Sequence, residues 1–370
     1  LSQFFFKIFI LFISMNINLG KKLPSFLQKN EKKKEEKEKY QNYLTNGSSL
    51  LEEQLSFCKN GHHKVPIRSF TAEEIINSTN GFQENVGPYL YKGNFNKKKV
   101  LVKKYDGKKN MKRQHDHVIR DIVISSEMSY HKNVLKIIGY CLEFERVALI
   151  YEYSQFDYLF NCIQFLTWEK RMKIAIDIAS VILYLHIEFP RPIIHRNLTS
   201  HNVILDQNGV VKLYNFECCI PLPIGKVQVQ DDLIGTIGYL DPEYVWSSKV
   251  TLKSDVFSFG LFLLMLLSGR EIKVNHEGKY YSEDYGLISL ENYAKICVKN
   301  NKLKDNFIDS KILKDEQKKL KGFLNLALRC AQKIGENRPN MIDVAKELQR
   351  IKKGEMQELL PTMECLIDWN

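Results

Sequence analysis

The stretch KSDVFSFGLFLLMLLSGR, residues 253–270, decides the architecture of the second half of the chain. Between Asp255 and Leu267 it is apolar on almost every side, and Gly269 follows at a position where helices commonly end. A helix that is apolar all round is buried rather than half-exposed. We therefore expect this segment to form a helix inside a large helical core.

The segments around this helix predict two unlike halves. WEKRMKIAIDIASVILYLHIEF (168–189) repeats apolar residues at helical spacing. Further helices are expected over 289–299, 315–332 and 340–352. The first half instead holds alternating, strand-like runs over 89–95, 98–105, 133–143 and 146–154, with one helix over 115–129. The sequence thus predicts an α+β fold of two lobes, a small β-rich N-lobe and a large helical C-lobe, with a cleft between them.

Two helices are expected before the strands. TAEEIINSTNGF (71–82) begins with a capping box, because Thr71 can accept from the backbone and Glu74 can reach back. NGSSLLEEQLSF (46–57) reads as a short helix capped by Ser48 or Ser49. Its predicted apolar side consists of Leu50, Leu51 and Leu55.

These patterns give the domain organisation. We expect an apolar tail over 1–20, a basic extension with a short helix over 21–68, the N-lobe over 69–152, the C-lobe over 153–352 and a C-terminal tail over 353–370. In the tail, the run from Phe4 to Ile13 is shorter than the roughly 20 residues that span a bilayer. We interpret it as a disordered tail or as a translation artefact before Met15, and membrane targeting is the alternative.

The charge of the chain restricts its partners. The net charge is +11, and basic residues gather over 21–39 and 92–120. Such runs are usually solvated surface, but they also attract anionic lipid or an acidic partner. No nucleic-acid-binding motif accompanies them, so we expect no nucleic acid. The eight cysteines form no C-x-x-C pair, which is typical of reduced thiols in a cytosolic protein.

Several long motifs fall in one order along the chain. They are HRNLTSHN (195–202), GTIGYLDPEY (235–244), the helix 253–270 and ENRPNMIDVAKELQ (336–349). With them the chain resembles eukaryotic protein kinases over about residues 69–352, and most of all plant receptor-like kinases of the wall-associated type. YLTNGSSLLEEQL (43–55), VPIRSFTAEEI (65–75), HKNVLKIIGYCLEF (131–144) and PLPIGKVQVQDDLIGTIGYLDPEY (221–244) make it similar to the ZRK class of receptor-like cytoplasmic pseudokinases.

The resemblance implies an ATP site, but the phosphate cover is changed. It assigns Lys103, Asp121 and Glu152 to the cofactor, with Asp121 as the partner of the lysine and Glu127 as the alternative. The three glycine positions of the phosphate-covering loop hold Gln83, Asn85 and Pro88, and a proline has no N–H to offer a phosphate. These changes argue against ATP binding without excluding it.

The catalytic positions of the resemblance are degenerate. Asn197 replaces the aspartate that accepts the proton of the substrate, and a neutral amide cannot do so. Asn215 replaces the aspartate that binds magnesium, while Asn202 keeps the second ligand position. We therefore expect no magnesium and no other metal. Glu217 follows where the family has a glycine, and we expect its effect to be structural.

The structural positions of the resemblance are kept. His195 and Phe216 should pack into one core, and Asp255 should hold the backbone of the loop at 195–197. Glu243 is expected to form a buried pair with Arg338. No Ser, Thr or Tyr lies between Phe216 and Thr236, so Arg196 should lack the phosphate that this arginine usually binds.

The catalytic positions are changed, whereas the structural positions are kept. Together these two observations favour an adaptor. The resemblance implies a cytoplasmic role in plant immune signalling, with an NLR immune receptor, other receptor-like cytoplasmic kinases or bacterial effectors as partners. A weakly active ATP-dependent serine/threonine kinase is the alternative. A fragment tethered to the plasma membrane as a peripheral protein is compatible with both.

We expect partner contacts at the N-terminal helix around 48–58, at the basic N-lobe and at the segment 217–236, and the apolar stretch CCIPLPIGKVQVQ (218–230) is the favoured interaction surface. We assign partner contacts to Ile224, Val229 and, just beyond this stretch, Thr236. The alternative is that this segment folds back and plugs the cleft.

Overall fold

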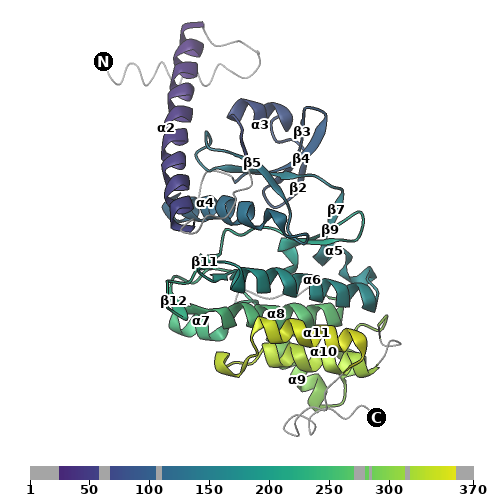
Figure 1. Cartoon of the computed structure of the whole chain (residues 1–370). Coiled ribbons are helices and arrows are strands. Elements are labelled where there is room, and N and C mark those ends of the chain that lie inside the picture. The colour runs from purple at the N-terminus through teal and green to yellow at the C-terminus, as the bar shows by residue number, and fades with distance from the viewer. Residues whose placement is uncertain are drawn as a thin grey trace, which may run out of the picture.

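The computed structural model describes residues 25–57, 67–105, 111–270, 280–282, 286–312 and 317–355. The tail over 1–20 and most of the expected tail over 353–370 lie outside this range. Within it the fold is α+β, with a β-rich N-lobe above a helical C-lobe (Figure 1). In these described parts, no helix is both long and apolar enough to span a membrane.

The N-lobe is built on a six-stranded sheet in the order β1-β5-β6-β4-β3-β2. Its elements are β1 (Arg68–Ser69), α3 (Ala72–Ser78), β2 (Asn85–Gly87), β3 (Leu90–Phe95), β4 (Lys98–Lys103), α4 (Met111–Glu127), β5 (Ile137–Cys141) and β6 (Ala148–Glu152). The capping box of Thr71 and Glu74 is confirmed at the start of α3. In the β3–β4 hairpin Leu90 lies opposite Lys103, which fixes the lysine at the edge of the cleft.

The prediction of a short helix over 46–57 is wrong. One helix of 33 residues, α2 (Ser25–Phe57), covers this region and extends beyond the N-lobe (Figure 1). Lysine and glutamate are good helix formers, and Glu35 pairs with Lys39 at 2.8 Å along the helix. The serines at 48 and 49 lie inside the helix, where Ser49 Oγ donates to Thr45 O over 3.2 Å instead of capping a terminus.

The C-lobe contains the remaining elements. They are β7 (Phe156–Tyr158), α5 (Leu159–Cys162), α6 (Trp168–Ile187), β8 (Ile193–Ile194), β9 (Val203–Asp206), β10 (Val211–Leu213), β11 (Ile220–Pro221), β12 (Gln228–Gln230), α7 (Pro242–Ser247), β13 (Lys249–Thr251), α8 (Leu252–Ser268), β14 (Tyr280–Ser282), β15 (Gly286–Ile288), α9 (Leu290–Lys299), α10 (Gln317–Cys330) and α11 (Met341–Lys353). Short 3₁₀ helices lie at Met128–Tyr130, Ile163–Phe165, Ser200–Asn202 and Gly335–Asn337, and a π-helical turn lies at Leu303–Phe307.

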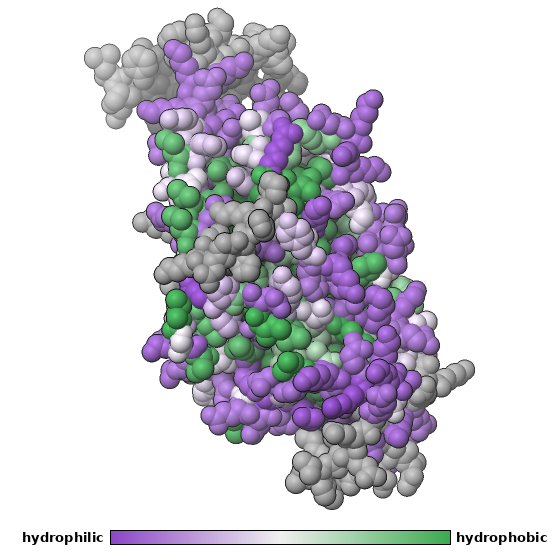
Figure 2. Space-filling view, in the orientation of Figure 1, coloured by the Kyte–Doolittle hydropathy of each residue, from purple (hydrophilic) through white to green (hydrophobic). Residues whose placement is uncertain are grey.

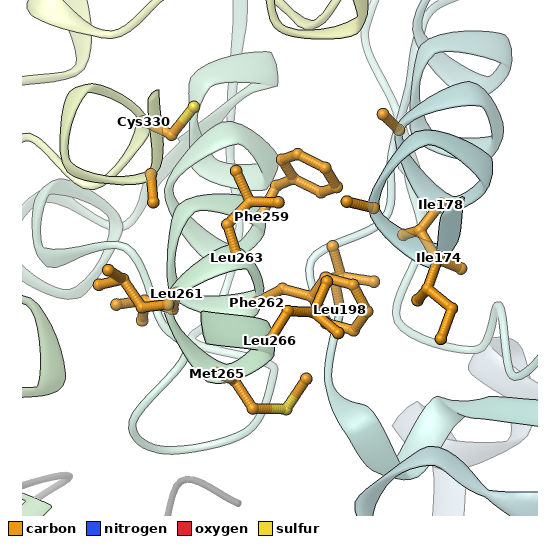
Figure 3. Close-up of a cluster of buried hydrophobic side chains, with 14 of the residues drawn as sticks. Ile174, Ile178, Leu198, Phe259, Leu261, Phe262, Leu263, Met265, Leu266 and Cys330 are labelled. Carbon is orange, nitrogen blue, oxygen red and sulfur yellow. The ribbon is translucent and has the colours of Figure 1, made fainter. Parts of the chain in front are cut away.

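Helix α8 is the buried helix that the sequence predicts. Every residue from Ser254 to Ser268 is buried. Figure 3 shows its side chains on several sides of the helix, with Phe259 directed towards α6 and Leu261 towards the opposite side. A Cβ on Gly260 would lie 2.7 Å from the backbone nitrogen of Ala331, so glycine allows the end of α10 to approach closely.

The prediction that Arg338 pairs with Glu243 is wrong. The buried guanidinium of Arg338 instead donates to Asp241, with 2.7 Å between Nη2 and Oδ1. Asp241 caps α7, which turns its carboxylate into the protein, while Glu243 accepts from the backbone N–H of Gly335 over 2.9 Å. Both acidic residues therefore anchor the segment before α11, but the ion pair belongs to Asp241.

Replacing Arg338 by alanine should destabilise the C-lobe strongly. Arg338→Ala leaves the buried carboxylate of Asp241 without its cation, which typically costs about 3–5 kcal/mol. Glu243→Ala is the matched control, since it removes one hydrogen bond and should cost only about 1–2 kcal/mol. The free energy of unfolding in urea measures both. Equal losses in the two variants would contradict the observed pairing.

Candidate functional site

The loop over 195–202 lies in the cleft and is held from below by Asp255 of α8. The carboxylate of Asp255 accepts from the backbone N–H groups of His195 and Arg196, each over 2.8 Å. It also lies 2.9 Å from Nε2 of His186. Burial alone would raise the pKa of Asp255, but the hydrogen bond and charge of His186 and the contacts with His195 hold that pKa below its usual value. Asp255 is thus an ionised anchor of the loop.

His195 supports the loop from inside the core. Its ring packs against Phe216, with 5.6 Å between the ring centroids. Burial lowers the pKa of His195 to about 4, although the charges of Asp255 and Asp121 oppose this shift. The neutral ring accepts from the backbone N–H of Asn197 through Nδ1 over 3.2 Å. The histidine is therefore a packing residue.

Asn197 joins the loop to the segment that follows Phe216. Its side-chain oxygen accepts from the hydroxyl of Thr236 over 2.6 Å, and its carbonyl oxygen accepts from the side chain of Asn202 over 2.8 Å. A carboxamide has no basic atom that could take a proton from a hydroxyl group. Asn197 therefore acts as a hydrogen-bonding link between two parts of the site.

Lys103 is buried, and its ammonium group meets three acceptors of the same chain. Its Nζ lies 2.8 Å from Oδ2 of Asp121, 2.5 Å from Oδ1 of Asn215 and 3.4 Å from Oε2 of Glu217. Burial would lower the pKa of Lys103, but the charges of Asp121 and Glu217 raise it above its usual value. A lysine has three N–H donors, so the protein itself uses the full donor capacity of this group.

Glu217 is a cleft carboxylate. It accepts from the hydroxyl of Tyr105 and faces Lys103. Burial would raise the pKa of Glu217, but the charge of Lys103 and the hydrogen bond from Tyr105 lower it. Sequence reasoning missed Tyr105, although it lies two residues after Lys103 and two-residue spacing puts side chains on one face of a strand.

The two magnesium positions of the resemblance bind each other. The side-chain nitrogen of Asn215 donates to the side-chain oxygen of Asn202 over 3.1 Å. Neutral amides do not provide the carboxylates with which proteins hold magnesium, so these residues do not fit the ion. Across the part of the chain that the structure describes, no group of three or more His, Cys, Asp or Glu side chains could hold a metal.

The aromatic side chain of Tyr158 packs against β2. Tyr158, at the end of β7, is so close to β2 that a Cβ on Gly87 would lie 1.7 Å from its hydroxyl oxygen. Tyr158 belongs to a buried cluster that includes Leu90, Leu101, Tyr151, Ile204 and Tyr214. Two of these cluster residues could have been noticed in the sequence, because Tyr151 stands directly before Glu152 and Tyr214 directly before Asn215.

Two further observations concern the expected cofactor site. The side chain of Glu152 is exposed, and its backbone N–H donates to the carbonyl oxygen of Lys136 over 2.9 Å. A surface cavity of about 480 Å³ lies elsewhere, between α3 and the β3–β4 hairpin. It is lined by Ser78, Thr79, Asn80, Gln83, Glu84, Lys92, Gly93, Asn94, Lys99 and Tyr153, and it contains none of the catalytic positions.

Arg196 has an anionic partner that the sequence analysis missed. Its Nη1 lies 2.5 Å from Oδ2 of Asp231, and its Nε donates to the carbonyl oxygen of Cys218. Arg196 therefore contacts a carboxylate of the segment after Phe216 without any phosphate. A Cβ on Gly235 would lie 2.8 Å from the carbonyl oxygen of Arg196, so only glycine lets the segment pass this close to the loop.

The segment over 217–236, which we call the activation segment, does not plug the cleft beyond Glu217. Strand β11 pairs with β8, and β12 pairs with β13, so the segment lies along the C-lobe. Ile224 is 73% exposed and Val227 is 81% exposed, whereas Val229 is partly buried against the cluster that contains Tyr244 and Val250. Trp246 of the neighbouring α7 is 88% exposed. Hydrophobic surface is visible over this region in Figure 2.

Removing the charge of Asp231 should loosen the activation segment. Asp231→Asn keeps the shape of the side chain but weakens its bond to Arg196. A hydrogen bond to a charged group contributes about 1.5–3 kcal/mol, so backbone amides in 220–235 should exchange their hydrogens about tenfold faster. Hydrogen-exchange mass spectrometry measures this, with Asp157→Asn, the exposed residue of β7, as the isosteric control. Unchanged exchange in Asp231→Asn would show that the ion pair does not hold the segment.

Comparison with known proteins agrees with the geometry. The profile of the family described as "Protein kinase domain" matches residues 88–348. The chain is similar to "Non-functional pseudokinase ZED1" of Arabidopsis thaliana, with 36% identity over 88% of this chain and 99% of that protein. It is similar to "Non-functional pseudokinase ZRK2" of the same plant, with 36% identity over 90% of this chain and 98% of that protein. "Serine/threonine-protein kinase ZRK1" is 35% identical over 84% of this chain and 92% of that protein.

Proposed function

The chain belongs to the protein kinase family, and on this premise we propose that it is an adaptor that transfers no phosphate. The observation that carries the proposal is the state of Lys103. Its three donors are bound by Asp121, Asn215 and Glu217, so the group that would hold the phosphates of a nucleotide is already engaged. The names of two relatives, which call them non-functional pseudokinases, support the same conclusion.

The residues at the other positions that phosphoryl transfer requires also make hydrogen bonds within the protein. The position of the general base holds the amide of Asn197, which accepts from Thr236, and loss of a base alone costs about 10²–10⁴-fold in rate. The position of the metal-binding aspartate holds the amide of Asn215, which bonds Asn202 and Lys103. We propose that the chain binds neither magnesium nor ATP in this cleft, since Tyr158 and Glu217 would both have to move.

We expect no phosphoryl transfer above background with Mg²⁺ or Mn²⁺, and no rise in melting temperature with millimolar ATP. The double variant Tyr158→Ala with Glu217→Gly should regain a nucleotide-dependent rise, because it vacates the cleft and frees one donor of Lys103. Incorporation of radiolabel by the natural chain that disappears in Lys103→Ala would favour a weakly active serine/threonine kinase. The name of one relative as a serine/threonine-protein kinase is the observation that supports that alternative.

The activation segment is our proposed partner surface. Ile224 and Val227 present apolar side chains to solvent, and the pair of Arg196 with Asp231 holds the segment in place. A surface ordered in advance loses less entropy on binding. We propose that it contacts an NLR immune receptor, another receptor-like cytoplasmic kinase or a bacterial effector in the cytoplasm. The lysines of α2 would allow a peripheral contact with anionic lipid at the plasma membrane.

Placing a charge at Ile224 should abolish partner binding and leave stability unchanged. Ile224→Asp alters an exposed residue, so its melting temperature should stay within about one degree while the captured NLR receptor or kinase falls at least tenfold. Val229→Asp should instead lower the melting temperature, because Val229 packs partly into the β12–β13 region. Ile342→Asp on α11 is the exposed control.

Immunoprecipitation from plant tissue, quantified by mass spectrometry, measures the partner. Full recovery of the same partner by Ile224→Asp would remove the activation segment from the interface. Equal loss with Ile342→Asp would show that added charge has a general effect.

A further inference from the structure

The outer face of α2 carries a row of exposed apolar side chains, which we call the α2 stripe. It consists of Tyr40, Leu44, Leu51 and Leu55, which are 64%, 47%, 57% and 65% exposed. In a helix of 3.6 residues per turn, these four positions fall within about 60° of one another. Along the axis they span about 23 Å. Figure 2 shows this hydrophobic surface over the lower half of α2, while the upper part is hydrophilic.

The opposite face of α2 is already occupied by the N-lobe. Asn46 donates to the carbonyl oxygens of Leu142 and Phe144 over 2.7 and 2.9 Å. Leu50 is buried, and Glu53 pairs with Arg120 of α4 at 2.8 Å. The midlines of the two faces are roughly 140° apart on the helix. The stripe thus points away from the body of the protein, and a second helix could approach it without meeting the N-lobe.

The spacing of the stripe is the same when it is read in either direction. Leu44 lies four positions after Tyr40, and Leu55 lies four positions after Leu51. Antiparallel pairing of two copies, centred between Gly47 and Ser48, places Tyr40 against Leu55 and Leu44 against Leu51 at the same time. At the centre, Ser48 is small and exposed, whereas a Cβ on Gly47 would lie 3.8 Å from the side chain of Leu142 in the N-lobe. Contacts of this self-complementary kind are typical of twofold homodimers.

Charge restricts the other arrangements of two such helices. In a parallel pair, the exposed Lys33 and Lys37, which lie on the stripe side of the helix, would meet their copies and repel each other. An antiparallel pair shifted by one heptad towards the N-terminus would bring Lys37 against Leu51. The register centred on Gly47 and Ser48 pairs all four residues of the stripe and keeps the lysines out of the apolar contact.

We propose that the α2 stripe is a homodimer interface, in which two copies of this chain pair through antiparallel α2 helices. The inference is independent of the proposed adaptor function, because the stripe lies on the N-lobe side and Ile224 lies on the C-lobe. Two single helix faces form a small interface, at the low end of the range for specific complexes, below about 1,200 Å² in total. The dimer should therefore dissociate at concentrations of tens of micromolar.

Sedimentation velocity of the full chain between about 1 and 100 µM tests the dimer, and we expect a shift from monomer to dimer over this range. Leu44→Glu should raise the dissociation constant at least tenfold, because it places a carboxylate against Leu51 of the second copy. Adding Leu51→Lys to Leu44→Glu should restore the dimer, because antiparallel pairing then forms two Glu–Lys contacts. A parallel pair would instead align like charges. Ile342→Glu on α11 is the exposed control and should dimerise like the natural chain.

Each other outcome overturns the inference. A natural chain that remains monomeric at 100 µM would remove the second copy as the occupant of the stripe. A double variant that melts normally but stays monomeric would exclude the antiparallel register. The natural chain could instead sediment as a monomer, while immunoprecipitation with Leu44→Glu recovers less of a different protein. In that case the stripe is the binding surface for that protein.

Discussion

The carboxylate of Asp255 is the interaction on which the rest of the site depends. It is buried, ionised and bonded to two consecutive backbone N–H groups, so it fixes the path of the chain at His195 and Arg196. From that fixed path, Arg196 reaches Asp231 and Asn197 reaches Thr236. A buried ion is costly unless its bonds are satisfied, and here each of those bonds orders a different part of the cleft. The core of the C-lobe thereby positions the activation segment.

The positions that the resemblance assigns to catalysis make contacts within the protein. Asn215 and Asn202 bond each other, and Glu217 lies with Asp121 around Lys103. A buried lysine with one carboxylate partner would attract further anions. With its donors filled and a second carboxylate beside it, Lys103 links β4 to α4 and to the residues around Phe216. The contacts of Lys103 therefore contribute to the stability of the folded chain itself.

The sequence predicted what depends on local pattern and missed what depends on the path of the chain. The largely apolar stretch between Asp255 and Leu267 predicted buried α8, and the spacing of Thr71 and Glu74 predicted a cap. The partner of Arg338 could not be predicted, because Asp241 and Glu243 are two residues apart and only the capping geometry of α7 decides which one faces the guanidinium. The role of Asp231 could not be predicted either, because it depends on the pairing of β12 with β13.

An ordered activation segment favours the binding of a partner, but it leaves less for phosphorylation to switch. A kinase that is switched by phosphorylation gains from a segment that is loose until a phosphate meets its arginine. In this chain the carboxylate that meets Arg196 is encoded in the sequence, so the pair forms without phosphorylation. A segment that is already ordered loses less entropy when a partner binds. On the proposed function, the pair of Arg196 with Asp231 therefore favours the activation segment as a docking surface.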